Sequence, residues 1–327
     1  MDKNSKILIT GGQGWIGKKL GAYLSQEGFK EVHALAGTRN GLDLGDDSTL
    51  GWAFDINPEV VVHLATRPPT KENCLEYPAG MMYENLYITS KVLEEARMSG
   101  CKKFIMAWHS SCYPEQQILP HKEEDLWEGT PHWSRRYYGN TAKVMMELNA
   151  AFSSQFPDFV GINLIFPEVY GPNSRFNPKR NSIIESIITN VSAAKKYDVN
   201  LEANGNSKTS RDFLYVDDAV RAIYDVIQFA DECETYNVSQ GHDVNIKDLH
   251  KTVADMVGFE KEIIWKEEYV DAKERSFLNT SRIRKDLGWT PTTDMETGLA
   301  KTIAWHDENL TVSTINPDSI SDSILVR

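Results

Sequence analysis

The glycine-rich stretch TGGQGWIG at residues 10–17 constrains the fold more than any other part of the sequence. The apolar residues 7–9 precede it and predict a short buried strand. Gly11, Gly14 and Gly17 follow at the spacing of a turn that joins a strand to a helix and holds a pyrophosphate. In such a turn Gly11 permits the sharp bend, Gly14 leaves room for phosphate, and Gly17 lets the helix pack on the strand. The stretch therefore predicts a dinucleotide-binding turn.

The helix predicted after this turn, at about residues 15–27, supports the same interpretation. Trp15 and Ile16 begin it, and its apolar residues recur on one side. The N–H groups at a helix start and the positive end of the helix dipole favour phosphate binding. An ordinary glycine-rich turn is the alternative, and the strand–turn–helix context argues against it.

The acidic composition limits the classes of partner. The 327 residues carry a formal net charge of −12, which argues against a nucleic-acid surface, because such surfaces need clustered Lys and Arg. The four cysteines have no paired spacing, so we expect reduced thiols, and no metal site is predicted. The sequence shows no membrane-length apolar run and no leader segment before the first strand, so we expect a cytoplasmic protein without membrane contact.

Apolar runs alternate with helical patterns along the first half of the chain. This alternation predicts a parallel sheet with helices on both faces. The expected fold is therefore α/β, with a doubly wound (Rossmann) sheet and a smaller, discontinuous C-terminal substrate-binding domain. Strands are expected at 31–37, 58–65, 102–108 and 160–166, helices at 46–54, 81–99 and 136–153, and a long loop at 113–134.

Changes in composition predict where the two domains begin and end. The dinucleotide-binding domain is expected to cover residues 1–166, with a segment near 211–240 that returns to it. The substrate domain is expected at 167–210 and 241–310. Residues 311–327 are rich in Ser, Asp and Asn, and we expect a loose tail there. The cleft between two such domains is where ligands of this fold class bind.

The end of the second predicted strand bears on the choice of dinucleotide. An acidic residue there favours NAD(H), because it binds the ribose 2′-hydroxyl. Here the strand ends in AGTRNG, and Arg39 suits the 2′-phosphate of NADP(H). We therefore expect NADP(H) rather than NAD(H), with a solvated Arg39 as the alternative. Further cofactor contacts are expected under the adenine from Asp43 and Leu44, and beside the sugar and pyrophosphate from Leu64, Ala65 and Thr66.

A set of short motifs in fixed order resembles a known superfamily. The motifs are TGGQGWIG (10–17), HLAT (63–66), SSCYP (110–114), YYGNTAK (137–143), VYGP (169–172), SRDFLYVDD (210–218) and IRKDLGWTP (283–291). Together they resemble the extended short-chain dehydrogenase/reductases, the nucleotide-sugar epimerases, dehydratases and reductases. Within that superfamily the SSC, TRNGLDL and GPNSRFNP stretches look most like the GDP-L-fucose synthase branch. The resemblance implies a nucleotide-diphosphate sugar substrate and a homodimer packed through the helices at 81–99 and 136–153.

The resemblance implies a Ser/Thr, Tyr and Lys site, where a phenol exchanges a proton with the sugar while hydride moves to or from the nicotinamide. Tyr and Lys stand four residues apart, on one helix face, in this superfamily. Here Lys143 is present, but Gly139 stands four residues before it, and Tyr138 is displaced by about 100° around a regular helix. Either an irregular helix start or a π-bulge turns Tyr138 into the cleft, or the phenol is absent.

The turn after the fourth predicted strand is expected to supply the serine of this site. Ser110 or Ser111 would donate to the substrate oxygen, depending on the alignment, and His109 either takes that role or packs beneath the loop. Cys112 matches the thiol of the epimerising branch, where a nearby Lys lowers the pKa of the thiol, or is a small buried residue. Ser182 stands where the branch has the histidine that partners this cysteine.

Substrate binding is expected from Asn173, Lys179 and Arg211. Arg211 matches an arginine that holds the diphosphate in this superfamily, because a guanidinium pairs well with phosphate oxygens. Lys179 adds local positive charge, and Asn173 lies in a loop expected to roof the sugar; solvated residues are the alternative.

The sequence thus predicts an NADP(H)-dependent reductase/epimerase of a nucleotide-linked keto-sugar. Two alternatives stay open. One is a non-reducing epimerase or dehydratase that retains its cofactor, and the other is a catalytically idle homologue that binds cofactor and nucleotide sugar.

Overall fold

The computed structural model describes residues 1–35, 44–70, 72–115, 118–174, 176, 182–204, 208–266 and 274–310. The chain divides into two compact units. Residues 279–290, which we expected in the substrate domain, cluster with the first unit. Unit 1 consists of Met1–Phe166, Ala219–Val238 and Asn279–Thr290, and unit 2 of Pro167–Asp218, Ser239–Leu278 and Pro291–Arg327.

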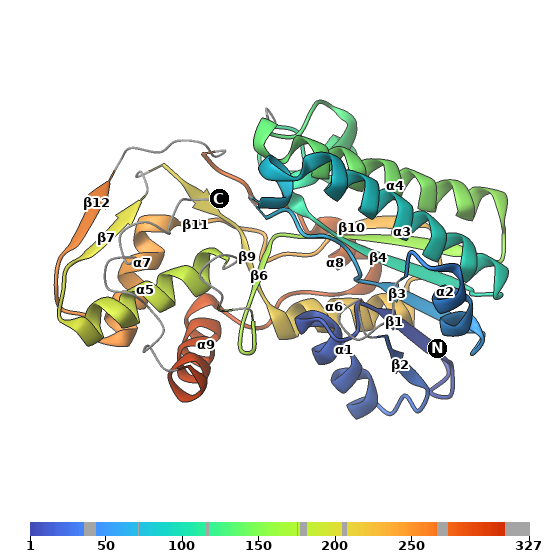
Figure 1. The fold of residues 1–327 in the computed structure, drawn as a ribbon, viewed down its shortest axis with the longest axis horizontal. Coiled ribbons are helices and arrows are strands. Elements are labelled where there is room, and N and C mark those ends of the chain that lie inside the picture. Colours follow the sequence, from blue (N-terminus) through green and yellow to red (C-terminus); the bar gives the residue numbers. More distant parts are fainter. Residues whose placement is uncertain are drawn as a thin grey trace. The chain divides into compact units, whose positions relative to one another are not determined.

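Unit 1 is built on a six-stranded sheet with the strand order β2-β1-β3-β4-β5-β10 (Figure 1). Every neighbouring pair in it is parallel. The chain therefore starts in the middle of the sheet, moves to one edge and then crosses to the other, which confirms the predicted doubly wound α/β fold. Its strands are β1 (Ile7–Thr10), β2 (Val32–Ala34), β3 (Val60–His63), β4 (Lys103–His109), β5 (Val160–Phe166) and β10 (Glu234–Asn237).

Helices cover both faces of this sheet, which explains why its inner strands are continuous apolar runs. In Figure 1, α3 and α4 lie side by side on one face, and α1 and α6 lie on the other. The rings of Tyr23 and Tyr224 join α1 to α6, edge to face at 5.4 Å. These helices are α1 (Trp15–Gln26), α2 (Asp47–Phe54), α3 (Pro78–Met98), α4 (Arg136–Gln155), α6 (Val216–Phe229) and α8 (Ser281–Leu287).

In its described residues, unit 2 has three two-stranded sheets and three helices, which are packed around an apolar core. The sheets are β6 with β9 and β7 with β12, both parallel, and β8 with β11, which is antiparallel. The helices are α5 (Ile183–Tyr197), α7 (Ile246–Val257) and α9 (Met295–Asn309). The strands are β6 (Glu168–Tyr170), β7 (Leu201–Asn204), β8 (Ser210–Arg211), β9 (Phe213–Tyr215), β11 (Val244–Asn245) and β12 (Ile263–Lys266). Within the described ranges, no helix of either unit combines the length and apolarity needed to cross a membrane.

The long loop predicted at 113–134 has more local structure than the sequence suggested. Its described residues include the 3₁₀ turn η4 (Glu123–Trp127) and most of a second one, η5 (Trp133–Arg135). Pro114 and Pro131 form an antiparallel bridge, and the Glu115 N–H donates to the Thr130 carbonyl at 2.9 Å. The ends of the loop are thus held together in front of α4.

Candidate active site

The glycine-rich turn between β1 and α1 has almost no room for side chains. Gly11 has a φ of +69°, and a Cβ there would lie 2.9 Å from the amide nitrogen of Ala65. The N–H of Gly14 closes the turn by donating to the Gly11 carbonyl at 2.8 Å. A Cβ at Gly17 would lie only 2.5 Å from that same carbonyl oxygen. Glycine is therefore required here both by conformation and by space.

Gly12 belongs to the same cradle, although the spacing argument did not single it out. A Cβ at this position would lie 2.6 Å from the Cα of Ala34 in β2. The second glycine of the GG pair is thus explained by the close approach of β2, which depends on sheet order. Strand pairing of this kind is a long-range property that the motif alone does not specify.

The start of α1 suits an anionic ligand. The N-cap of α1 is Gly14, which has no side chain to cap the first N–H groups of the helix. The first turn of α1, all of which is described, carries no acidic residue. The partial positive charge of the helix start is therefore not neutralised by the helix itself. A backbone cradle that a Cβ would fill, ending at such a helix start, fits the pyrophosphate of a dinucleotide.

The adenine end of the predicted cofactor site is described only in part. Arg39 and Asp43 fall within 36–43, outside the described residues, so their roles stay predictions. Leu44 is buried, while Leu64, Ala65 and Thr66 after β3 are half-buried. Beyond them, the buried Asn85 of α3 accepts from the Arg67 N–H at 2.7 Å and donates to the Arg67 carbonyl at 3.1 Å, which fixes the segment after β3.

A buried histidine ties the turn to its neighbours. His63 at the end of β3 is fully buried, with Nδ1 2.7 Å from the Thr10 hydroxyl and Nε2 3.1 Å from the Thr89 hydroxyl. Burial lowers the pKa of His63 to about 4, so the imidazole is neutral near pH 7. The network joins β1, β3 and α3 directly behind the glycine-rich turn.

Tyr138 belongs to the core of unit 1. All of α4 is described, and it is α-helical from Arg136 to Gln155, so the π-bulge offered as one explanation for the displaced tyrosine does not occur. Tyr138 is 2% exposed and packs edge to face on Trp108 at 5.8 Å. Its hydroxyl accepts from the His109 N–H at 3.2 Å, and burial raises the pKa of the phenol.

The side-chain space of position 139 is filled by other parts of the chain. A Cβ at Gly139 would lie 2.6 Å from Cγ of Pro131 and 2.9 Å from the carbonyl oxygen of Ser111. Pro131 reaches this place because it is bridged to Pro114 at the closed end of the loop. The resemblance implies a tyrosine at position 139. In this chain the space that its side chain would need is filled by the ring of Pro131.

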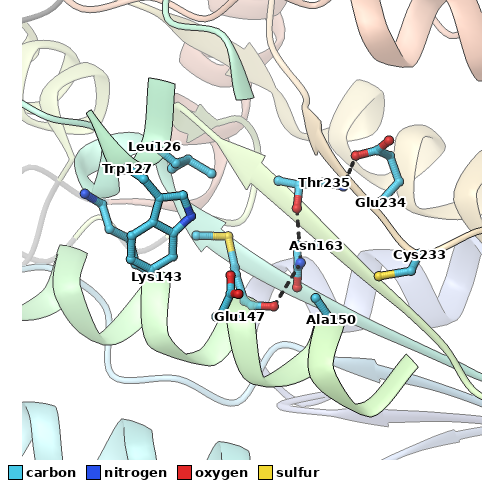
Figure 2. Close-up of a pocket in the computed structure, with 10 residues that line it drawn as sticks. Leu126, Trp127, Lys143, Glu147, Ala150, Asn163, Cys233, Glu234 and Thr235 are labelled. Atoms are coloured by element: carbon cyan, nitrogen blue, oxygen red, sulfur yellow. Dashed lines mark hydrogen bonds between the residues drawn. The ribbon is translucent and has the colours of Figure 1, made fainter. Parts of the chain in front are cut away.

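Lys143 also faces this loop. The side chain is buried, and its Nζ donates to the Gly129 carbonyl at 2.9 Å. The same ammonium lies 5.6 Å from the centre of the Trp127 ring, and burial lowers the pKa of the lysine. Figure 2 shows it beside Trp127 at a pocket of about 190 Å³ whose walls also include Glu147 and Thr235. Residues 127–131 therefore cover the α4 face that carries Gly139 and Lys143.

The turn after β4 holds the predicted serines and cysteine. Ser110, Ser111 and Cys112 form a 3₁₀ turn, in which the Ser111 N–H donates to Nδ1 of His109 at 3.0 Å. Cys112 is fully buried. Among the described residues, the buried hydroxyl of Ser111 has no hydrogen-bond partner. The turn thus holds one buried hydroxyl whose hydrogen-bonding capacity is unused within the described chain.

A buried polar network holds the next residues in place. The Tyr113 hydroxyl donates to Oδ1 of Asn237 at 2.8 Å, and its ring stacks on His121 at 4.8 Å. The Asn237 N–H donates to Glu123 at 2.8 Å. Arg282 from α8 bonds Glu234 and Glu124. The loop at 113–134 is therefore tied to β10 and α8 by contacts that sequence spacing could not predict.

The predicted substrate residues lie in unit 2. Arg211 in β8 donates to the Ser210 carbonyl at 2.7 Å, and Asn173 adopts a positive φ of 63° in the segment after β6. Ser182, found where the resemblance implies a histidine, is the N-cap of α5. Lys179 lies outside the described residues. In the parts of the chain that the structure describes, no cluster of three or more His, Cys, Asp or Glu could hold a metal ion.

Comparisons with known proteins agree with this architecture. The model of the NAD dependent epimerase/dehydratase family matches residues 7–239. A probable GDP-L-fucose synthase 1 from Oryza sativa subsp. japonica is 27% identical over 312 residues, which cover 94% of this chain and 94% of the relative.

Two solved structures are similar over nearly the whole chain. MlghC, a GDP-mannoheptose C4 reductase from Campylobacter jejuni with NADP bound, is 25% identical with a TM-score of 0.82, covering 94% of this chain and 99% of that one. A GDP-6-OMe-4-keto-L-xylo-heptose reductase from C. jejuni has a TM-score of 0.86 at 22% identity, covering 95% and 99%. The second likeness concerns the fold alone.

Proposed function

Because this chain belongs to the NAD dependent epimerase/dehydratase family, we propose that it binds NADP(H) on the glycine-rich turn and acts on a nucleotide-linked keto-sugar. The proposal rests mainly on the tight packing of the turn. A Cβ at Gly11, Gly12 or Gly17 would collide with backbone atoms of the neighbouring chain segments. Similarity along nearly the whole chain to a probable GDP-L-fucose synthase and to an NADP-bound GDP-mannoheptose C4 reductase supports the substrate class.

The chain's own residues have distinct tasks toward this cofactor. When bound, NADPH supplies the hydride that reduces a ketone. The backbone at Gly11, Gly14 and Gly17 would hold the pyrophosphate at the start of α1, with Trp15 and Ile16 in its first turn. Arg39 would pair with the 2′-phosphate. The remaining contacts would come from Asp43 and Leu44 at the adenine and from Leu64, Ala65 and Thr66 at the sugar.

Reduction also requires a proton for the ketone oxygen. We assign this task first to the turn after β4, because the Ser111 hydroxyl is buried and, within the described chain, accepts and donates no hydrogen bond. Ser110 and Cys112 flank it. Tyr138 is a second candidate, since its phenol lies at the same strand end, but it would have to leave the His109 amide. Lys143 would need to leave Gly129 to reach a ligand.

The substrate would be held by unit 2. Arg211 and Lys179 would contact the diphosphate, and Asn173 would contact the sugar. We also propose a homodimer that packs through α3 and α4, where Tyr83 is 65% and Val144 49% exposed.

A direct assay tests this function. Purified protein is mixed with NADPH and GDP-4-keto-6-deoxymannose, and with other 4-keto nucleotide sugars, while NADPH absorbance is followed. We expect oxidation of NADPH with at least one of them. If NADPH binds but no substrate oxidises it, the reductase hypothesis is wrong and the second candidate function, described next, is favoured.

The second candidate is an idle homologue that binds cofactor and nucleotide sugar without turnover. Its support is the closed α4 face, where Pro131 and the Ser111 carbonyl fill the space at Gly139. On this hypothesis both ligands raise the melting temperature of the protein, and no keto-sugar is converted. Any turnover above the rate without protein contradicts it.

A further inference from the structure

Two His-x-Ser sequences stand at the start of 3₁₀ turns in unit 1, and they differ in how the serine meets the ring. In HSS at 109–111 and HWS at 132–134, the histidine is the N-cap of the turn, and its Nδ1 accepts the serine N–H at 3.0 and 3.3 Å. The Ser111 hydroxyl has no partner among the described residues. The Ser134 hydroxyl, in contrast, lies 2.8 Å from Nδ1 of His132. Capping alone therefore does not explain this second contact.

The tautomer of His132 follows from its contacts. Nδ1 accepts the Ser134 N–H, so this nitrogen carries the lone pair, and the ring proton of the neutral imidazole is on Nε2. Nε2 lies 3.7 Å from Oε1 of Glu115. The Ser134 hydroxyl therefore donates to an unprotonated nitrogen, and a carboxylate stands on the opposite side of the ring.

These three side chains have the roles found in a serine hydrolase site. A serine hydroxyl becomes a nucleophile when an unprotonated imidazole lies within hydrogen-bond reach and a third group orients that imidazole. Ser134, His132 and Glu115 meet this description, and all of them belong to the loop at 113–134. None of the three is among the residues assigned above to the cofactor or to proton transfer.

The surroundings of Ser134 also supply positive charge. The serine lies two residues before α4, a helix of 20 residues whose first turn carries no acidic residue. Nη1 of Arg135 lies 3.3 Å from the Ser134 carbonyl oxygen. A helix start and a guanidinium both stabilise the negative charge that develops on a carbonyl oxygen under nucleophilic attack.

The exposure of these side chains indicates the kind of substrate. Ser134 and His132 are half-buried, and the Glu115 side chain is 47% exposed. The ring of Trp133 is exposed, and its centre lies 5.7 Å from that of the His132 ring. An exposed indole offers an apolar surface to an acyl or aryl group. The site therefore suits a small uncharged ester.

We propose that Ser134, His132 and Glu115 hydrolyse small carboxylic esters, an activity separate from the one proposed for the NADP(H) site. Oγ of Ser134 attacks the ester carbonyl carbon, and its proton passes to Nδ1 of His132. The bond from that carbon to the alcohol oxygen then breaks, and the alcohol leaves with this proton. Water next attacks the acyl-serine and gives one proton to Nδ1. The bond to Oγ breaks, Oγ takes that proton, and the carboxylic acid is released.

The test follows the hydrolysis of p-nitrophenyl acetate by the full chain, without NADPH or a keto-sugar. We expect the wild type to release p-nitrophenol faster than buffer does, and Ser134→Ala and His132→Asn each to lower this rate about a hundredfold. Glu115→Gln should lower kcat about tenfold and leave KM unchanged, because Glu115 positions His132 without touching the ester. Melting temperatures show that each variant is folded.

A matched control is needed because surface imidazoles also cleave activated esters. His33 of β2 has a carboxylate partner as well, with Nε2 3.3 Å from Oε2 of Glu31. The residue two positions after it is Leu35 rather than a serine. The variant His33→Asn is therefore expected to leave the rate of ester hydrolysis unchanged.

Labelling with a fluorophosphonate measures the nucleophile directly, because this reagent forms a bond to an activated serine oxygen. We expect peptide mass mapping to find the label on Ser134 in the wild type. His132→Asn should prevent labelling although the serine is still present. Hydrolysis that is no faster than in buffer, or that Ser134→Ala retains, would overturn the inference. So would a wild type whose Ser134 is not labelled.

Discussion

The glycine-rich turn and the start of α4 belong to the same unit, but they use the absence of a side chain differently. At Gly11 and Gly17 the backbone closes on itself, and the turn ends at a helix start that can receive phosphate. At Gly139 the vacated space is taken by Pro131 of the same chain. Glycine therefore leaves the turn between β1 and α1 suited to a phosphate group. At the start of α4, in contrast, the space beside glycine is filled by another segment of the same chain.

This difference separates cofactor binding from proton transfer. The turn combines close backbone packing with a helix start that suits a pyrophosphate, and the His63 network holds it in place. The α4 face differs, because the Lys143 ammonium is bonded to Gly129 and the Tyr138 phenol is buried. On the function proposed above, this chain binds its cofactor at the turn, while its proton chemistry is supplied by the turn after β4 or is lost.

The largest effect is expected at Gly17. The variant Gly17→Val places side-chain atoms 2.5 Å from the Gly11 carbonyl oxygen, so we expect the free energy of unfolding to fall by about 3 kcal/mol and NADPH binding to be lost. Urea unfolding and an NADPH titration measure the two effects. Gly21→Ala on the same helix is the control. Its Cβ would meet only the Ile9 side chain at 4.0 Å, so stability should rise by up to about 1 kcal/mol. Equal effects of the two variants would contradict the account.

His63 gives a pH-dependent effect behind the turn. The unfolded chain binds a proton at this residue below about pH 6.5, whereas folded His63 does so only below about pH 4. Stability that depends on neutral His63 is therefore complete above pH 6.5 and is lost as the pH falls toward 4. Between pH 7 and pH 5, the stability advantage of the wild type over His63→Asn should shrink by about 2 kcal/mol.

Urea unfolding of both proteins at the two pH values measures this change. His250, whose pKa burial also lowers to about 4, is present in both and cancels. Parallel stability curves for wild type and variant would show that His63 does not titrate in this way.

The closed α4 face predicts a coupling between two positions. Gly139→Ala should lower the free energy of unfolding by about 2 kcal/mol, because its Cβ collides with Pro131 and the Ser111 carbonyl. Adding Pro131→Gly removes one of these collisions, so the double variant should recover about 1 kcal/mol relative to the sum of the single effects. A Gly139→Ala protein that is as stable as the wild type would mean that the face is open.

The smallest effect is expected at Tyr138. The variant Tyr138→Phe removes the hydroxyl that accepts from the half-buried His109 N–H, which should lower stability by about 1 kcal/mol. Because the phenol is buried, we expect NADPH oxidation to change by less than about tenfold. A loss of about a hundredfold, with NADPH binding intact, would instead identify Tyr138 as the proton donor.

Much of the fold could be predicted because it depends on local patterns. Continuous apolar runs such as 58–65 and the spacing of Gly11, Gly14 and Gly17 specify buried strands and a strand–turn–helix unit with little help from distant residues. The doubly wound sheet then follows from their alternation with helices. Residues 36–43 and Lys179 lie outside the described chain, so the NADP(H) preference of Arg39 and the diphosphate role of Lys179 stay predictions.

The candidate active site was harder to predict, because its contacts are long-range. The resemblance implied that Gly139 stands where the superfamily has a tyrosine, but it did not show that Pro131 fills the space beside Gly139. Nor could it show that Lys143 donates to Gly129, fourteen residues away in the loop. The 113–134 segment was predicted only as a long loop, and its sequence did not indicate the hydrogen bonds from Tyr113 to Asn237 and from Arg282 to Glu124 that hold it.

The most direct test of the central claim is a fluorescence titration of NADPH into the wild type and Gly139→Ala, at a temperature where both are folded. The account predicts saturable binding to the wild type and a dissociation constant for the variant within about threefold, because position 139 belongs to the closed region. Absence of binding to the wild type would contradict the claim that the glycine-rich turn holds the cofactor. Loss of binding in Gly139→Ala would contradict the separation of the two regions.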